Sequence, residues 1–292
     1  MSLTVREIWT QSQTELINAL NLEMHTARLE AKTLLQAALN VNLAWLIAHE
    51  TDTLEPNVIS QFQILLERRL SGEPIAYILG KREFYGLDFI VTPDTLIPRP
   101  DTETLVEAAL AKIPTGKSYS ILDLGTGSGV IALAIAKNRP KSRVIAVDVS
   151  STAIKVAENN ACNLAISNIE FVLSHWFDQL NNIRFDVIVS NPPYIAYDDA
   201  HLSQGDLRFE PHNALVSGID GLEDIRHIIT NSLIHLHPQG WLMLEHGYDQ
   251  AEQVADLMAH AGLVNIETFK DLGQQERVTI GMNPLIVNTH WD

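Results

Sequence analysis

The sequence predicts an α/β protein with a doubly wound, mostly parallel sheet, preceded by a small helical domain. Three observations support this prediction. From residue 119 onward, strand-like and helix-like segments alternate, which is typical of a parallel sheet with helices on both faces. The last two strand-like segments have no helix between them, so this terminal pair should be antiparallel. Before residue 73 the chain has helical periodicity and little strand signal.

Residues 1–72 are expected to form the helical domain. Apolar residues recur there at three- and four-residue steps, which places them on one helix face. They include Leu16, Ile17, Leu20, Leu34, Leu35, Ala38 and Leu39. Pro56 should begin a further helix, which Ser71-Gly72-Glu73-Pro74 ends. The domain is interpreted as a substrate-recognition module or as a structural extension, and composition does not separate the two.

Residues 73–100 are expected to form a hairpin linker. Aromatic and β-branched residues surround Gly86, which favours two short strands joined by a turn. A helix should follow the Leu-Ile-Pro-Arg-Pro-Asp-Thr-Glu stretch at 96–103 and run to about Lys112. Arg99 stands between two prolines, so its backbone is restricted. It is a surface charge or a contributor to substrate or cofactor binding, and the second interpretation is favoured.

Residues 101–292 are expected to form the α/β domain. The apolar runs and turn signals predict its elements by length and composition. Strands are expected at 119–124, 143–147, 169–173, 185–190, 241–245, 264–270 and 277–282. Helices are expected at 129–137, 151–163, 222–236 and 250–261.

Charge and composition argue against several classes of protein. The formal net charge of −16 disfavours a general nucleic-acid binder, whose affinity comes largely from Lys and Arg on phosphates. Apolar runs are too short to span a membrane, and the N-terminus has no secretory pattern. The single Cys162 permits no internal disulfide, so a reducing cytoplasm is expected. Of the histidines, only His235 and His237 stand close in sequence, so no metal site is expected.

A glycine-rich loop follows the first strand of the predicted sheet, with the sequence Asp123-Leu124-Gly125-Thr126-Gly127-Ser128-Gly129. Alternate glycines let the backbone turn sharply and approach a ligand, and the next helix offers unpaired N–H groups. Asp148 ends the second strand. In a sheet of this kind, a carboxylate at that position reaches the ribose hydroxyls of a nucleoside.

Two features of the loop distinguish between possible nucleoside ligands. In a dinucleotide fingerprint the third glycine falls one residue later, at the place of Val130. Asp123, directly before the loop, would be poorly placed beside a pyrophosphate. The same carboxylate suits a ligand with a cationic amine, such as the methionine portion of S-adenosylmethionine. The loop therefore favours S-adenosylmethionine over NAD.

The stretch Ser190-Asn191-Pro192-Pro193-Tyr194, here called the elbow, ends a buried strand. Two prolines cannot donate ladder hydrogen bonds and they stiffen the backbone, so the elbow should be rigid. The Asn191 side-chain oxygen and the Pro192 carbonyl would accept the two N–H bonds of a planar NH2 group, and the Tyr194 ring would cover its face. Such an arrangement would aim a weakly nucleophilic nitrogen at a methyl carbon. Methyl transfer is thus favoured over a plain strand-ending turn.

The glycine loop, Asp148 and the Asn-Pro-Pro-Tyr elbow occur in the order that resembles class I S-adenosylmethionine-dependent methyltransferases acting on planar amines. From about residue 70 to 283 the chain is similar to the PrmC/HemK family. The flanking motifs that carry this likeness are Gly-Glu-Pro-Ile-Ala-Tyr (72–77), Arg-Glu-Phe-Tyr-Gly (82–86), the 96–103 stretch, Val-Ser-Gly-Ile-Asp-Gly (216–221), Leu-Glu-His-Gly (244–247) and Asp-Leu-Gly-Gln-Gln-Glu-Arg-Val (271–278).

The resemblance implies methylation of the side-chain amide nitrogen of the glutamine in the Gly-Gly-Gln motif of class I peptide-chain release factors, and so modulation of translation termination. It implies that residues 125–129, Asp148, Trp176 and Asn191 contact the cofactor and that residues 191–194 hold the glutamine. It also implies that the helical domain helps to dock the release factor. One departure concerns adenine binding, because the family commonly has Ser-Asp before the tryptophan and this chain has Ser174-His175.

Two other functions remain open at this point. A DNA or RNA adenine methyltransferase would share the elbow chemistry, with base flipping to deliver the amine, but it requires a basic face that the net charge disfavours. A nucleoside-binding regulatory or scaffold protein could keep the same fold. The complete elbow argues against it, because cofactor binding alone does not need those groups.

Overall fold

A computed structural model describes residues 3–285, so the ends of the predicted domains, residues 1–2 and 286–292, lie outside the described part. The chain forms two compact units. The first holds residues up to Gly80 together with 201–209, and the second holds 81–200 and the residues from 210 onward. The predicted boundary at residue 72 differs from this division, because a short helix, α5, follows it and ends at Leu79.

The first unit is helical, as the apolar periodicity predicts. Its helices are α1 (Val5–Leu20), α2 (Met24–Leu39), α3 (Leu43–Ala48), α4 (Pro56–Leu70) and α5 (Ile75–Leu79). A reciprocal capping box of Thr4 and Glu7 begins α1, and Pro56 is the first residue of α4. Of the residues at the three- and four-residue steps, Leu16, Leu34 and Leu35 are fully buried in one core, and Ile17, Leu20, Ala38 and Leu39 are partly buried against it.

Residues 201–209 belong to this helical unit although they are distant from it in sequence. Arg69, near the end of α4, is only 5% exposed. Its guanidinium lies 2.8 Å from a carboxylate oxygen of Glu30 on α2 and 3.3 Å from one of Asp206. A buried cation needs such partners, because an unpaired charge is costly away from water. The pairs with Arg69 therefore help to hold the segment to the helices.

The second unit begins with the hairpin that the sequence predicts. Strands β1 (Lys81–Phe84) and β2 (Leu87–Ile90) pair antiparallel on either side of the turn at Gly86. A short 3-10 turn, η1 (Pro100–Thr102), then leads into α6 (Glu103–Lys112).

Within the described residues, seven strands form one sheet in the order β5-β4-β3-β6-β7-β9-β8. The strands β3 (Ser120–Leu124), β4 (Arg143–Asp148), β5 (Ile169–Leu173), β6 (Phe185–Ser190) and β7 (Leu236–Glu245) are parallel. The pair β8 (Val264–Lys270) and β9 (Glu276–Met282) is antiparallel, and β9 runs antiparallel to β7. The predicted doubly wound sheet with a terminal antiparallel pair is confirmed.

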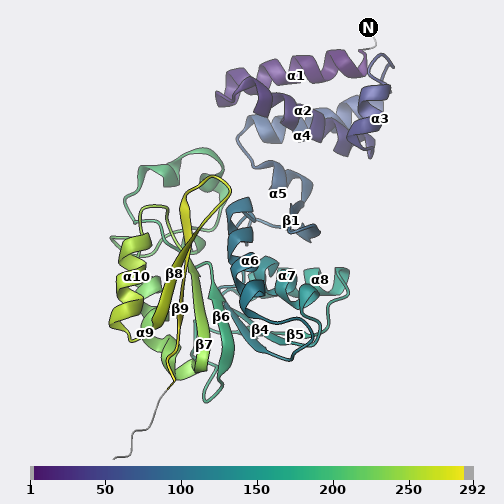
Figure 1. The fold of residues 1–292 in the computed structure, drawn as a ribbon. Coiled ribbons are helices and arrows are strands. Elements are labelled where there is room, and N and C mark those ends of the chain that lie inside the picture. Colours follow the sequence, from purple (N-terminus) through teal and green to yellow (C-terminus); the bar gives the residue numbers. More distant parts are fainter. Residues whose placement is uncertain (1–2, 286–292) are drawn as a thin grey trace, which may run out of the picture. The chain divides into compact units, whose positions relative to one another are not determined.

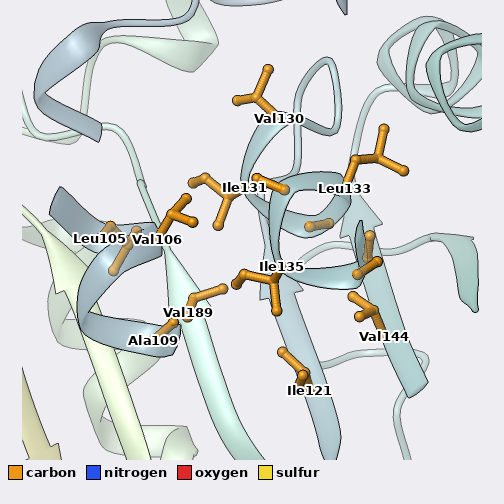
Figure 2. Packing of buried hydrophobic residues seen from close by; sticks show 14 of the residues in the cluster. Leu105, Val106, Ala109, Ile121, Val130, Ile131, Leu133, Ile135, Val144 and Val189 are labelled. Atoms are coloured by element: carbon orange, nitrogen blue, oxygen red, sulfur yellow. The ribbon is translucent and has the colours of Figure 1, made fainter. Parts of the chain in front are cut away.

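Helices cover both faces of this sheet (Figure 1). One face carries α6, α7 (Val130–Asn138) and α8 (Ser151–Asn163), and the other carries α9 (Glu223–His235) and α10 (Ala251–His260). Figure 2 shows the first layer, where Ile131 and Ile135 of α7 lie over Ile121 and Val189 of the central strands. The strands read as nearly continuous apolar runs because both of their faces are buried.

The strand β7 begins earlier than its predicted start at 241. Residues 236–240 include Pro238 and Gly240, which disfavour a strand. They nevertheless extend β7 because Gln239 and Gly240 exchange backbone hydrogen bonds of 2.8 Å with Asn283. Of the two neighbouring histidines, His235 is buried and its ring stacks on Phe177.

Candidate active site

The carboxyl ends of four neighbouring strands, β4, β3, β6 and β7, bring polar groups to one edge of the sheet. A cavity of about 300 Å³ opens there, at the lower end of the range usual for small-molecule sites. Six of the residues predicted for the site line it. They are Gly125, Gly127, Asp148, Trp176, Asn191 and Pro193.

The glycine loop takes backbone conformations that side chains oppose. Gly125 has a φ of +71°, and a Cβ there would stand 3.3 Å from the Trp176 ring. Gly129 has a φ of +86°, and its Cβ would stand 3.1 Å from that of Ala157 on α8. The first glycine thus lets the loop pass under an indole, and the last lets two helices approach.

Asp148, the last residue of β4, holds the glycine loop through a side-chain hydrogen bond. Its Oδ2 accepts a hydrogen bond from the Gly127 N–H (2.8 Å), and its Oδ1 accepts one from the Ser150 N–H (2.9 Å). Burial raises the pKa of this carboxyl, and the two N–H donors oppose that rise. Each carboxylate oxygen keeps a further lone pair, so Asp148 can still accept a ribose hydroxyl.

Trp176 is held in a left-handed backbone conformation with a φ of 44°, which is rare for a bulky residue. The Ser174 hydroxyl donates to the Trp176 carbonyl at 3.0 Å and helps to keep this conformation. The preceding His175, which departs from the Ser-Asp pattern expected from the motif resemblance, also lines the cavity. Backbone conformations of this kind are concentrated at functional sites.

The Asn191 side chain points its NH2 group toward the turn η1. This NH2 donates to the Thr102 hydroxyl oxygen at 3.2 Å. Within residues 3–285, the Asn191 side-chain oxygen has no hydrogen-bond partner. Asn191 thus keeps an unused acceptor beside the cavity that it lines.

Tyr194 lies behind the cavity lining. Its hydroxyl is 3.4 Å from the Glu245 Oε1 at the end of β7, and its backbone carbonyl accepts from the Gln250 side chain at 3.1 Å. Burial and the Glu245 charge raise the pKa of the Tyr194 hydroxyl, so it stays protonated and acts as a donor. Neither Pro192 nor Tyr194 is among the residues that line the cavity.

Asp123 and the loop hydroxyls also lie beneath the surface. Asp123 is fully buried; its Oδ2 accepts from the Thr126 hydroxyl at 2.6 Å, and its Oδ1 has no partner within the described residues. Burial raises the pKa of the Asp123 carboxyl to about 7. The Ser128 carbonyl accepts from the buried Asn160 amide at 2.9 Å. The cavity is therefore not lined by Asp123, Thr126, Ser128 or Gly129.

The raised pKa of Asp123 has a consequence for stability. Between about pH 4 and pH 7 the folded chain holds a proton at Asp123 that the unfolded chain has released, so this contribution to stability is lost as pH rises through 7. Asp123→Asn, which has no charge to bury, should stabilise the protein relative to wild type by on the order of 2 kcal/mol more at pH 8 than at pH 5. Urea unfolding at both pH values measures this difference.

The exposed acid Glu158 on α8 supplies the matched control. Glu158→Gln should shift the unfolding free energy by the same small amount at pH 5 and at pH 8. An Asp123→Asn difference that did not change with pH would contradict the assignment of the raised pKa to Asp123.

Two further residues become meaningful only in the structure. Thr102 and Glu245 lie behind the elbow, next to Asn191 and Tyr194. Both belong to motifs noted in the sequence, but the sequence alone assigns neither residue a role. The signal for Glu245 is an acid at a strand end beside the elbow strand. Arg99 does not line the cavity; it forms an ion pair with the buried Glu210, whose other oxygen accepts from the Ile97 N–H at 3.2 Å.

The groups at the cavity fit a nucleoside. The Asp148 carboxylate suits ribose hydroxyls, and the Trp176 ring offers a flat apolar face. Asp123, predicted to face a cationic amine, is fully buried beneath the loop and does not line the cavity. Among residues 3–285, no group of three or more His, Cys, Asp or Glu is arranged to hold a metal, and no helix has the length and apolar character needed to cross a membrane.

Comparisons with known proteins agree with this arrangement. The family model of the methyltransferase small domain matches residues 101–206, and that of the PrmC N-terminal domain matches residues 12–80. A solved methyltransferase structure from Pyrococcus furiosus is 20% identical to this chain. The matched region covers 75% of this chain and 98% of the Pyrococcus furiosus chain, with a TM-score of 0.53. At that identity the likeness concerns the fold alone, and it confirms the predicted class I methyltransferase fold.

Two relatives are similar over nearly their whole length. The release factor glutamine methyltransferase of Xylella fastidiosa strain Temecula1 is 48% identical over 257 residues, which cover 88% of this chain and 94% of the relative. The protein of the same name from Escherichia coli strain K12 is 48% identical over 254 residues, which cover 87% and 91%. The chain therefore belongs to the release factor glutamine methyltransferase family, as its motifs predict.

Proposed function

We propose that this protein transfers a methyl group from S-adenosylmethionine to the side-chain amide nitrogen of the glutamine in the Gly-Gly-Gln motif of peptide-chain release factors. The proposal is supported by one observation above the others. Asn191, with an unused acceptor, lines the same cavity as Asp148 and the glycine loop. A nucleoside site and a site for a planar amide thus share one space.

Asp148, Gly125, Gly127 and Trp176 are the residues that would hold the cofactor. When bound, S-adenosylmethionine supplies an electrophilic methyl group on a sulfonium. Asp148 would bind the ribose, and the Trp176 ring would cover the adenine. The loop passes close because Gly125 has no Cβ.

The elbow would bind the glutamine amide by its NH2 group. An amide nitrogen is a poor nucleophile because its lone pair is delocalised into the carbonyl. The Asn191 side-chain oxygen and the Pro192 carbonyl would accept its two N–H bonds, hold the nitrogen in place and favour the positive charge that builds on it. The elbow prolines keep both acceptors rigid, so little reorganisation is needed.

Release factors are thus the proposed partners, and no direct nucleic-acid binding is expected of a chain with a net charge of −16. The helical unit is proposed to help dock the release factor. We also propose a cytoplasmic location, since the substrate acts in translation termination and the chain's one cysteine is exposed.

Labelled S-adenosylmethionine, supplied with unmethylated release factor or with duplex DNA, tests the proposal. Label should enter the release factor and not the DNA. A release factor with its Gly-Gly-Gln glutamine changed to alanine is the matched control, and it should take up no label. Transfer to DNA with none to the release factor would overturn the proposal in favour of a nucleobase methyltransferase.

A further inference from the structure

A buried carboxylate lies behind the elbow and does not line the cavity. Glu245 ends β7 and is 1% exposed. Its Oε1 accepts from the Tyr194 hydroxyl, and its Oε2 has no partner within the described residues. The desolvation of such a group is costly, so its retention at this point calls for a physical reason.

Thr102 connects this carboxylate to Asn191. The Thr102 hydroxyl lies beside the Glu245 carboxylate, and the Thr102 oxygen accepts from the Asn191 NH2 at 3.2 Å. Glu245 therefore touches both ends of the elbow, Tyr194 directly and Asn191 through one hydroxyl. Thr102 itself is 3% exposed, so water does not compete for these bonds.

The direction of these bonds follows from the number of protons available. A hydroxyl has one proton to donate, whereas an ionised carboxylate only accepts. When Thr102 gives its proton to Glu245, it can only accept from Asn191. The Asn191 NH2 then faces Thr102, and the amide oxygen must lie on the opposite edge.

We infer that Glu245 is a positioning residue which, through the Thr102 hydroxyl, keeps the Asn191 amide oxygen turned to the substrate. This inference rests on the proposed function, in which that oxygen accepts a substrate N–H. Burial and Asp101 of η1 oppose the ionised form of this carboxylate, whereas Arg277 on β9 favours it, so Glu245 is mainly ionised above about pH 7.

Glu245→Gln tests the direction of the bonds with little change of shape. The glutamine NH2 can donate to Thr102, which frees the Thr102 proton for the Asn191 oxygen and lets the amide turn over. We expect kcat to fall about 10- to 30-fold, with KM for the release factor and the affinity for S-adenosylhomocysteine changed by less than about threefold. Thermal melting should show a folded variant, because a buried charge has been removed.

Thr102 offers a matched pair of variants. Thr102→Ser keeps the hydroxyl and should retain kcat within about threefold, whereas Thr102→Val keeps the shape and should lose as much as Glu245→Gln. Because the residues act in one chain of bonds, the double variant Glu245→Gln with Thr102→Val should be little worse than either single variant. Equal losses in Thr102→Ser and Thr102→Val would mark Thr102 as a packing residue and overturn the inference.

The pH profile gives a readout that packing would not move. Burial raises the pKa of the Glu245 carboxyl to about 7, and a protonated Glu245 becomes a donor. The wild-type kcat should therefore fall below pH 7. This limb should be reduced in Glu245→Gln, which has no carboxyl at this position to protonate.

A spectroscopic measurement separates this inference from the proposed function. In 15N-labelled protein without substrate, the Asn191 side-chain NH2, assigned by its loss in Asn191→Asp, should exchange slowly in wild type and Thr102→Ser and rapidly in Glu245→Gln and Thr102→Val. Identical exchange and identical kcat in wild type and Glu245→Gln would refute the positioning role. A wild-type protein that leaves the release factor unmethylated would instead refute the proposed function.

Discussion

Asn191→Ala should lower kcat for release factor methylation on the order of 10³-fold, while the cofactor still binds within about tenfold of its wild-type affinity. The variant removes the side-chain oxygen that accepts the substrate N–H, so the nitrogen is no longer aimed and its growing charge is no longer offset. Cofactor binding should persist because Asp148, Trp176 and the glycine loop line the cavity independently of the elbow side chain.

The measurement combines single-turnover transfer of labelled methyl with calorimetric titration of S-adenosylhomocysteine. Asn159→Ala, at an exposed position on α8, is the matched control and should leave both quantities within about twofold of wild type. Undiminished turnover in Asn191→Ala would show that the elbow side chain has no part in the reaction.

Asp148→Ala should have the opposite signature. The variant loses the proposed ribose bonds and also the acceptor for the Gly127 N–H, so the loop keeps only its backbone bonds to Val147 of β4. We expect the dissociation constant of the cofactor to rise on the order of 100- to 1,000-fold, with kcat at saturating cofactor within about tenfold of wild type.

Calorimetry and a cofactor-dependence series of initial rates separate the two effects. Asp148→Asn keeps the shape and one acceptor, so it should fall between Asp148→Ala and wild type. Glu158→Ala removes an exposed acid from α8 and should leave the affinity unchanged. Tight cofactor binding by Asp148→Ala would remove Asp148 from the cofactor site.

The parts of the fold that the sequence predicts are those with a local pattern. The steps of Leu16, Leu34 and Leu35 mark helices, and the run before Asn191 marks β6, because periodicity and residue type depend on near neighbours. The beginning of β7 and the helix α5 have no such signal. Gln239 and Gly240 are drawn into the sheet by Asn283, and α5 is too short to show a helical period.

In the site, too, the residues with a local sequence signal are predictable and those placed by distant contacts are not. Asp148 and Asn191 are predictable because a polar residue at the end of a buried strand has few purely structural reasons to be there. Whether a loop residue faces the cavity or the interior is decided by packing, so the sequence does not reveal that Asp123 and Tyr194 lie behind the lining. The hydrogen bond from Asn191 to Thr102 joins residues far apart in the chain, and the sequence around neither residue predicts it.

The segment 201–209 bears on how such a protein can be inherited or re-engineered by exchange of parts. A recombination that replaced everything before residue 80 with another protein's helices would leave Asp206 behind without Arg69, because the segment is encoded after the elbow. A successful chimaera therefore needs a second exchange at 201–209. The helical unit is one folded body, but two separate stretches of the sequence encode it. Substitutions in one stretch should therefore be tolerated only together with matching substitutions in the other.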